Sequence, residues 1–180
     1  GIRVPMIIRW PSGLESGKLD SMIHFCDWLP SFASICNAKI PVHIKLDGHN
    51  IYPALTGKDT KVPEKRFWQF SRYEPNINTN AAMRDKEWKL VRPAFHQSFK
   101  IRPGDPEEDK KIRKAPWENH QPKTGLKPFC KKIDPLPLEL YNIKKDPYET
   151  ENLAHKYPAR VKTMKNELEN RIENLIEILN

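Results

Sequence analysis

The sequence has few cysteines, few glycines and no long apolar run. Its three cysteines, Cys26, Cys36 and Cys130, cannot all pair within one chain, so no disulfide framework is expected. No CxxC or HxxxH spacing occurs and the six histidines are scattered, which argues against a metal site in this segment. No stretch approaches the roughly 20 apolar residues that a membrane-spanning helix needs. These absences exclude disulfide-stapled domains, zinc modules and membrane-spanning helices.

Proline is abundant and the charge is unbalanced. Seventeen prolines against seven glycines, with 38% hydrophobic and 30% charged residues, predict a loop-rich α+β chain with a modest core. The net charge of +8 favours acidic partners such as sulfated glycans, nucleic acid or anionic surfaces. Much of the excess lies between Lys100 and Lys132, where prolines interrupt a Lys-rich stretch. This stretch is predicted to be a long solvated loop.

The first third of the chain predicts one strand and two helical pieces. Residues Val4–Trp10 read as a strand that would need neighbours to pair with. A short helix is expected from Asp27, as its N-cap, to about Asn37. Its predicted buried stripe consists of Phe25, Leu29, Phe32, Ala33 and Cys36. The pattern from Lys45 to Gly57 predicts a turn followed by a single helical turn.

The remainder predicts a small antiparallel sheet and a terminal helix. Strands are expected at Arg66–Phe70, Ala81–Arg84 and Trp88–Val91, with a hairpin turn joining the last two. Residues Leu138–Ile143 predict a further strand. Pro158 stands at a helix start, and apolar residues recur at helical spacing over some twenty residues after it. A helix packed on a small sheet is the expected result.

Five motifs occur in the order that they have in one known family. They are Gly1–Pro5 with Arg9–Pro11; His24 with Asp27, Leu29 and Pro30; Asp47–Gly48 with Leu55–Gly57; Arg84–Asp85 with Trp88–Val91; and Leu140–Asn142 with Asp146–Pro147 and Glu149–Ala154. In this order they resemble "GGxRVPxxxxWPG", "HxDLxPTL", "DGxxLxPLLxG", "RxGxWKLI" and "LYDLxxDPxExxNLA". The chain is therefore similar to the C-terminal portion of sulfatases of the arylsulfatase type, in the alkaline-phosphatase-like superfamily.

The resemblance implies an α+β fold with parts of two domains. Residues 1–60 would be the end of the large α/β/α sulfatase domain, contributing a strand and a helix. Residues 61–180 would be a C-terminal subdomain in which a long helix packs on a small antiparallel sheet. Within it, a basic loop is expected at about 96–134 and the terminal helix at about 158–179.

The resemblance also implies the chemistry of a parent protein. Such a sulfatase hydrolyses sulfate esters, here on a sulfated glycan, with a formylglycine made within "CxPSR" and with calcium. None of the three cysteines has Pro two places on and Arg four places on, so the nucleophile is not in this sequence. The calcium ligands and the assisting lysine and histidine are expected upstream, in a missing N-terminal half. No catalytic or metal residue is thus assigned here, the chain alone is predicted inactive, and the parent is expected to be exported.

Five side chains are candidates for contact with a sulfated carbohydrate or aryl sulfate substrate in the parent. They are Arg72, Tyr73, Asn80, Arg84 and His96. Cationic and amide donors suit sulfate, carboxylate or hydroxyl oxygens, and an aromatic ring suits a sugar face. A structural role competes with this reading, because Arg84 can pair with an acid at the sheet edge and Tyr73 can pack. His24 is predicted to bond backbone within the fold.

Two other functions stay open on the sequence. The basic loop and its aromatics suit a module that binds nucleic acid or another polyanion, although no recognised motif supports it. A phosphatase or phosphodiesterase of the same superfamily would share the scaffold but use Thr or Ser with two zinc ions. The motif ending in "NLA" argues against that second alternative.

Overall fold

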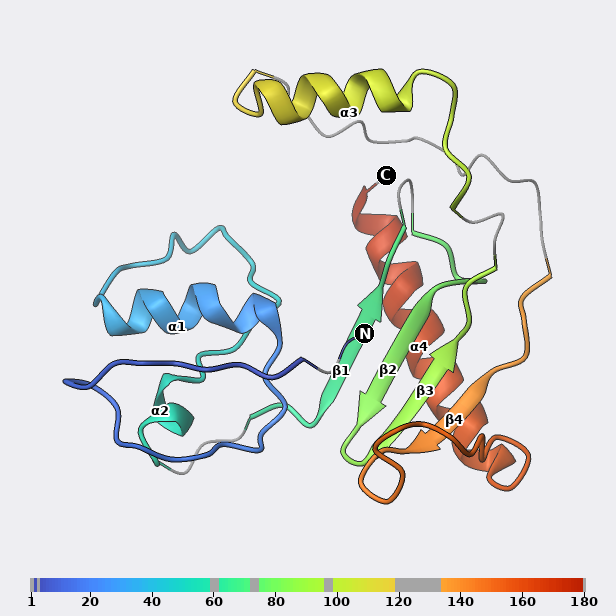
Figure 1. The fold of residues 1–180 in the computed structure, drawn as a ribbon, viewed down its shortest axis with the longest axis horizontal. Helices are drawn as coiled ribbons and strands as arrows, with labels where there is room; N and C mark the ends of the chain where they lie inside the picture. Colours follow the sequence, from blue (N-terminus) through green and yellow to red (C-terminus); the bar gives the residue numbers. More distant parts are fainter. Residues whose placement is uncertain are drawn as a thin grey trace. The chain divides into compact units, whose positions relative to one another are not determined.

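The computed structural model describes residue 2 and residues 4–58, 62–71, 75–95, 99–118 and 134–179 (Figure 1). The chain divides into two compact units, Gly1–Arg66 and Phe67–Asn180. We call them the N-terminal and C-terminal units and describe each by itself. Both helices and strands occur, as the α+β composition predicts.

The C-terminal unit is built on a four-stranded antiparallel sheet in the order β1-β2-β3-β4. The strands are β1 (Lys65–Gln69), whose first two residues belong to the N-terminal unit, β2 (Ala81–Asp85), β3 (Trp88–Arg92) and β4 (Glu139–Asn142). A two-residue turn at Lys86 and Glu87 closes the β2–β3 hairpin, and Lys86 has the positive φ of 53° that such turns require. The four strands predicted after residue 60 and the predicted hairpin are therefore confirmed.

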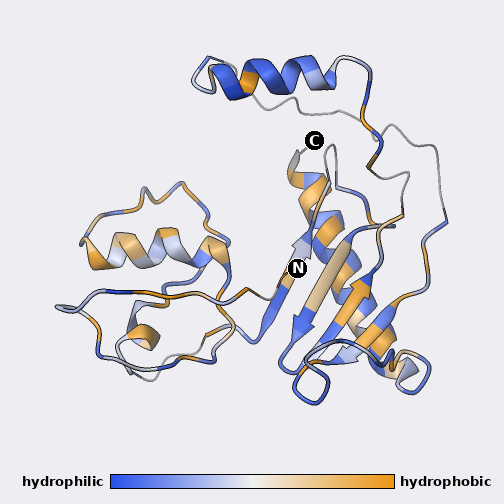
Figure 2. Cartoon of the chain, viewed as in Figure 1, coloured by the Kyte–Doolittle hydropathy of each residue, from blue (hydrophilic) through white to orange (hydrophobic). Residues whose placement is uncertain are grey.

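Helix α4 (Pro158–Leu179) covers one face of this sheet (Figure 1). Met83, Leu90 and Leu140 are aligned across β2, β3 and β4, and their buried side chains point toward the helix. Met164, Leu168 and Ile172 meet them from α4, at the i, i+4, i+8 spacing of one helix face. Figure 2 shows this apolar stripe along α4 beside the apolar strand β3. The sheet-and-helix core is thus the one that alternation and periodicity predict.

Part of the predicted basic loop is helical. Residues Asp105–Lys114 form α3, with a proline in the first turn, where it is tolerated. Acidic side chains occupy the first turn and basic ones the last, an order that stabilises a helix through its dipole. The charges at the two ends of α3 favour a helix here, whereas the proline content of the stretch had predicted a loop.

The opening segment of the N-terminal unit is not a strand. Residues 4–10 are extended but form no ladder, and Ile7 is 94% exposed. A strand exists only through hydrogen bonds to a neighbouring strand, and the described part of the unit supplies none to this segment. The strand prediction at Val4–Trp10 is wrong for this chain.

Two helices follow in this unit. A 3₁₀ turn, η1 (Phe25–Asp27), leads into α1 (Trp28–Ile35), and α2 (Tyr52–Leu55) is the predicted single helical turn. The predicted buried stripe of α1 is wrong, because Phe25, Leu29 and Phe32 are exposed and Cys36 is exposed as a free thiol. The buried positions are Asp27 and Ser31 instead. Periodicity identifies residues that share a face, but it does not say which face is covered.

Candidate functional site

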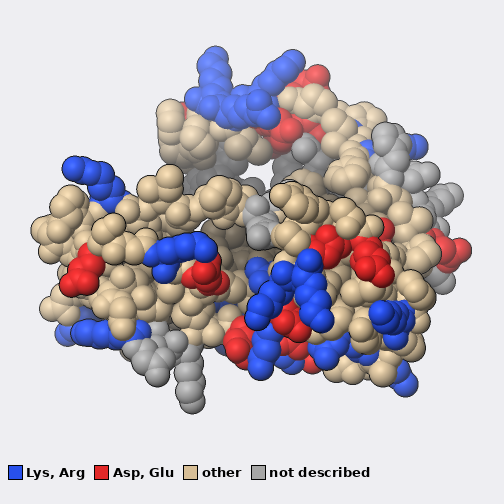
Figure 3. Space-filling view, turned by 60° about the horizontal axis from the view of Figure 1, so that its bottom comes forward, with Lys and Arg blue, Asp and Glu red and all other residues tan. Residues whose placement is uncertain are grey.

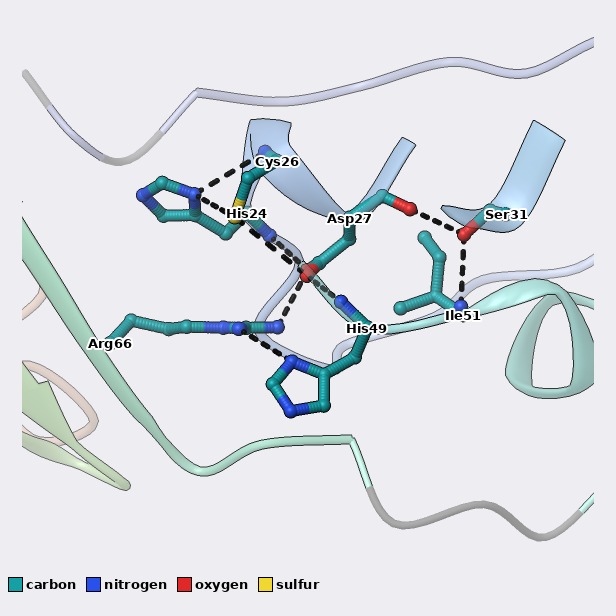
Figure 4. Close-up of polar contacts among 7 residues, drawn as sticks. All are labelled: His24, Cys26, Asp27, Ser31, His49, Ile51 and Arg66. Atoms are coloured by element: carbon teal, nitrogen blue, oxygen red, sulfur yellow. Dashed lines mark hydrogen bonds and ion pairs between the residues drawn. The ribbon is translucent and has the colours of Figure 1, made fainter. Parts of the chain in front are cut away.

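A buried polar cluster in the N-terminal unit is centred on Asp27, where η1 meets α1 (Figure 4). The Asp27 carboxylate is fully buried and does not cap α1. Its Oδ2 atom accepts from the His24 backbone N–H at 2.8 Å and from Arg66 Nη2 at 2.6 Å. Its Oδ1 atom accepts from the His49 backbone N–H at 2.9 Å. The buried charge is thus both paired and hydrogen-bonded, as a buried ion requires.

Ser31 extends the cluster along α1. Its hydroxyl donates to the Asp27 carbonyl at 2.5 Å and accepts from the Ile51 backbone N–H at 2.9 Å. A glycine is required nearby, because a Cβ at Gly48 would lie 1.9 Å from the Cys26 carbonyl oxygen. Segment 48–51 therefore lies against the start of α1, with Gly48 next to the Cys26 carbonyl at one end and the Ile51 N–H bonded to the Ser31 hydroxyl at the other. This accounts for the Asp-Gly motif and for the buried Ile51 that follows it.

His24 and Cys26 lie on the other side of Asp27. The His24 imidazole caps η1, since its Nδ1 atom accepts from the Cys26 backbone N–H at 3.4 Å and lies 3.0 Å from Cys26 Sγ. The prediction that His24 bonds backbone is confirmed. Burial and the neighbouring Arg66 charge lower the pKa of His24. Burial and Asp27 raise the pKa of the Cys26 thiol.

These shifts decide what the cluster can do chemically. A nucleophilic cysteine needs a lowered pKa and an activating base, whereas Cys26 is held as a neutral thiol. The imidazole is likewise biased toward its neutral form. Among the described residues, no group of three or more His, Cys, Asp and Glu side chains is placed to hold a metal ion. The bonds of the cluster therefore hold the segments around Asp27 and Arg66 together.

Of the five predicted substrate contacts, Arg72, Tyr73 and His96 lie outside the described residues. Asn80 precedes β2 with a left-handed φ of 55°. Its side-chain amide donates to the Phe70 carbonyl at 2.9 Å, and its own carbonyl accepts from the Phe70 N–H at 3.0 Å. Asn80 thus joins the ends of β1 and β2, which is a structural task.

Arg84 lies on the sheet face opposite α4, in a row that runs across three strands. It is aligned with Lys89 on β3, and Lys89 with Tyr141 on β4. The Arg84 guanidinium donates to the Lys86 carbonyl at 3.1 Å, and Lys89 Nζ lies 2.6 Å from Glu149. Two cations directly opposite one another are unfavourable unless negative charge compensates them. Glu149 supplies that compensation for Lys89, and Arg84 is bonded to the backbone of the β2–β3 turn.

Several residues in these two sites were not singled out from the sequence. The Asp27–Arg66 pair spans 39 residues, so no local pattern signals it. Tyr141 was quoted only as part of a motif, yet its hydroxyl donates to Glu139 at 2.9 Å. Burial, followed by this bond, raises the pKa of Tyr141 to about 12.

The described residues contain no helix long and apolar enough to cross a membrane.

Comparison with known proteins decides the family. The sequence model of the family described as "N-sulphoglucosamine sulphohydrolase, C-terminal" matches residues 1–121, more than half of the chain. The chain belongs to this sulfatase family. The predicted resemblance to the C-terminal portion of sulfatases is thereby confirmed.

Curated relatives of this sulfatase chain are themselves named as sulfatases. The ulvan-active sulfatase of Formosa agariphila is 29% identical over 166 residues, covering 86% of this chain and 29% of the relative. The N-acetylgalactosamine-6-O-sulfatase of Bacteroides thetaiotaomicron is 22% identical, covering 94% of this chain and 27% of the relative. Human arylsulfatase A is 25% identical, covering 67% of this chain and 26% of the relative. The sulfatase chain thus spans less than a third of the length of these relatives.

Solved structures agree on the fold. A candidate sulfatase from Bacteroides thetaiotaomicron superposes with a TM-score of 0.50 at 18% identity, covering 83% of this chain and 24% of the other. At this identity the likeness concerns the fold alone. It supports the predicted α+β C-terminal sulfatase architecture.

Proposed function

We propose that this chain is the C-terminal part of an enzyme that hydrolyses sulfate esters on a sulfated polysaccharide. The observation that carries the proposal is the family match over residues 1–121. Two relatives, named for ulvan and for N-acetylgalactosamine 6-O-sulfate, support a carbohydrate as the substrate class. The motif order along the chain supports the same assignment, because five separate segments agree with one family.

The proposed mechanism uses formylglycine as the nucleophile and calcium to neutralise the sulfate. The residues of this chain do not fit either group. No cysteine stands in a "CxPSR" sequence, and Cys26 is a neutral thiol within a structural cluster. The described residues offer no cluster that suits a metal ion. We therefore assign no catalytic step to this chain and expect it to be inactive without a further sulfatase segment.

What this chain would contribute is scaffold and substrate contact. We propose that the N-terminal unit completes the large sulfatase domain and that the C-terminal unit is the smaller C-terminal subdomain. Arg84 is the described side chain that we propose for contact with a substrate anion, because it lies on the sheet face that α4 does not cover. Its guanidinium suits the paired oxygens of a sulfate or carboxylate. Arg72, Tyr73 and His96 remain proposed contacts on the sequence alone, and the structural bonds of Asn80 make it a weaker candidate.

The experiment that tests this proposal measures sulfate release with calcium present. The 180-residue chain is compared with the same gene extended upstream and matured to formylglycine, on a generic aryl sulfate and on ulvan. We expect release by the extended protein and none by the 180 residues. Release by the 180 residues would overturn the mechanism, and failure of the matured protein on both substrates would exclude ulvan and aryl sulfates and leave a more specialised glycan sulfatase or a binding module.

Arg84→Gln in the extended protein tests the substrate contact separately. A lost anion contact should raise KM on ulvan while leaving turnover of the small aryl sulfate unchanged. Lys144→Gln is a matched control, since Lys144 is exposed in the turn after β4. Equal loss of activity on both substrates would instead assign Arg84 a structural role.

A further inference from the structure

The basic side chains of helix α3 are exposed to solvent, whereas most of its acidic side chains are half-buried. The exposed cations of the helix are Lys110, Lys111, Arg113 and Lys114. The half-buried acids of the helix are Asp105, Glu108 and Asp109. Glu107 is the acid of α3 that stays on the exposed side. Although the four acids and four bases of the helix cancel in formal charge, the bases are the more exposed side chains, and Figure 3 shows Lys and Arg side chains projecting at the top of the view with Asp and Glu side chains beside them.

Acidic side chains precede these cations by one turn of the helix: Glu107 precedes Lys110 and Lys111, and Asp109 precedes Arg113. Lys110 lies one turn before Arg113 and Lys114, on the same side of the helix. Like charges at these spacings destabilise an isolated helix. The helix dipole favours the cations in the last turn, but Lys110 precedes that turn. Acids one turn earlier offset part of this repulsion, and an anion bound along the exposed face would offset more of it.

An exposed aromatic side chain follows α3 in the chain. The chain leaves α3 through a turn in which the Glu118 N–H donates to the Ala115 carbonyl at 3.1 Å. Trp117 lies in this turn and is 71% exposed. An exposed indole offers a large flat apolar surface that a sugar ring can cover. Cations and an aromatic face, presented together, suit a ligand that carries both negative groups and ring faces.

We propose that α3 and Trp117 form a binding surface for a sulfated polysaccharide chain, separate from the residues that cleave it. The proposal rests on the proposed function, which makes such a polysaccharide the substrate. The cations would contact sulfate groups along the chain and the indole would stack on a sugar ring. A single-stranded nucleic acid shares this chemistry. The glycan is favoured because the family assignment and the relatives concern sulfate esters.

The test measures binding without turnover, using the 180-residue chain. The probes are ulvan, chemically desulfated ulvan and a single-stranded oligodeoxythymidine, compared by affinity electrophoresis at about 0.15 M salt. The variant K110Q/R113Q/K114Q is matched by K144Q/K145Q/K162Q, which removes the same charge from other exposed lysines. Trp117→Ala tests the stacking contribution. Unchanged thermal melting by circular dichroism confirms that each variant is folded.

We expect the α3 variant to bind ulvan about tenfold more weakly, while the matched control stays within about twofold. Trp117→Ala should also weaken binding, and desulfated ulvan should bind poorly. Equal loss in both triple variants, or none in the α3 variant, would overturn the proposal. Binding of the oligodeoxythymidine as tight as that of ulvan would replace the glycan with a general polyanion.

Failure of this proposal can be told apart from failure of the proposed function. Sulfate release from ulvan by the extended protein, together with unchanged binding by the α3 variant, would leave the function intact and reject the surface. Loss of binding in the α3 variant, with no sulfate release by the extended protein, would keep the surface and reject the function.

Discussion

Each of the two units of this chain is stabilised internally by a different kind of interaction. The C-terminal unit has an apolar core, in which Leu90, Leu140 and Leu168 are fully buried between sheet and helix. In the described part of the N-terminal unit, Ile51 is the buried hydrophobic residue, and Asp27 and Ser31 are buried with it. Large apolar side chains of that unit, such as Phe25 and Ile7, are exposed.

The comparison shows two ways to hold a chain segment in place. Apolar burial contributes roughly 25 cal/mol per Å² and tolerates small changes in geometry. A buried ion pair contributes little net free energy but is costly to break, because either partner alone is a charge without compensation. The N-terminal unit should therefore be the less stable of the two and the more sensitive to a single polar substitution.

The largest effect that we expect comes from Asp27→Asn. This change leaves the Arg66 guanidinium buried without a counter-charge, at a cost of about 3–5 kcal/mol in the free energy of unfolding. Hydrogen exchange read by mass spectrometry should show lost protection in peptides covering residues 24–51. Peptides covering residues 81–92 should keep theirs.

Asp20→Asn is the matched control, because Asp20 pairs with Lys18 in full exposure at 2.9 Å. It should change protection in neither region, as exposed pairs contribute little. Equal loss of protection in both regions after Asp27→Asn would show that the units unfold together, against the comparison drawn here.

Leu168→Ala should affect the C-terminal unit by a similar or smaller amount. Removing this fully buried side chain leaves a cavity between α4 and the sheet and should cost about 2–5 kcal/mol. Urea unfolding followed by far-ultraviolet circular dichroism measures the change. Ile178→Ala, in the same helix but 74% exposed, should leave the midpoint unchanged. A midpoint shift as large for Ile178→Ala would contradict the assigned core.

The smallest expected effect is a pH dependence confined to the N-terminal unit. Burial, followed by the Arg66 charge, lowers the pKa of His24 below its ordinary 6.5. The folded chain then binds fewer protons than the unfolded chain in this window. Its stability should therefore fall as the pH drops from 6.5 through the lower folded-state value. Hydrogen exchange at pH 7 and at about pH 5.5, corrected for intrinsic rates, measures this.

His24→Asn sharpens the same measurement. Asparagine retains a side-chain cap for η1 but does not titrate, so the acid-dependent loss in residues 24–51 should disappear. His155→Asn, at an exposed position, should leave the loss in place. Persistence of the full acid dependence in His24→Asn would assign it to another group.

The C-terminal unit was the predictable one. Alternation at Ala81–Arg84 and Trp88–Val91 and the apolar spacing after Pro158 identify its elements, because each signal lies within a few residues. The helix α3 was missed although its signals are equally local, namely an acidic first turn with a proline and a basic last turn. The prolines of the surrounding stretch favour a loop prediction and obscure these helix signals.

The candidate site also combines features that the sequence predicts with features that it does not. The motif containing His24 and Asp27 marked the right segment, and the backbone bond of His24 was foreseen. The partners of Asp27 were not foreseen, because His49 and Arg66 lie 22 and 39 residues from it in the sequence. The predicted hairpin brings Arg84 close to Lys89, whereas the alignment of Lys89 with Tyr141 on β4 follows only from the strand register.

The family, the strands of the sheet, the terminal helix and the absence of a "CxPSR" cysteine can all be read from the amino-acid sequence. Each of these depends on residue identity and short spacing. Tertiary structure alone decided that Asp27 binds Arg66 rather than capping α1, that the apolar side of α1 is exposed, and that residues 4–10 form no strand. Burial and strand pairing depend on what lies opposite a segment, and that is set by contacts between residues far apart in the chain.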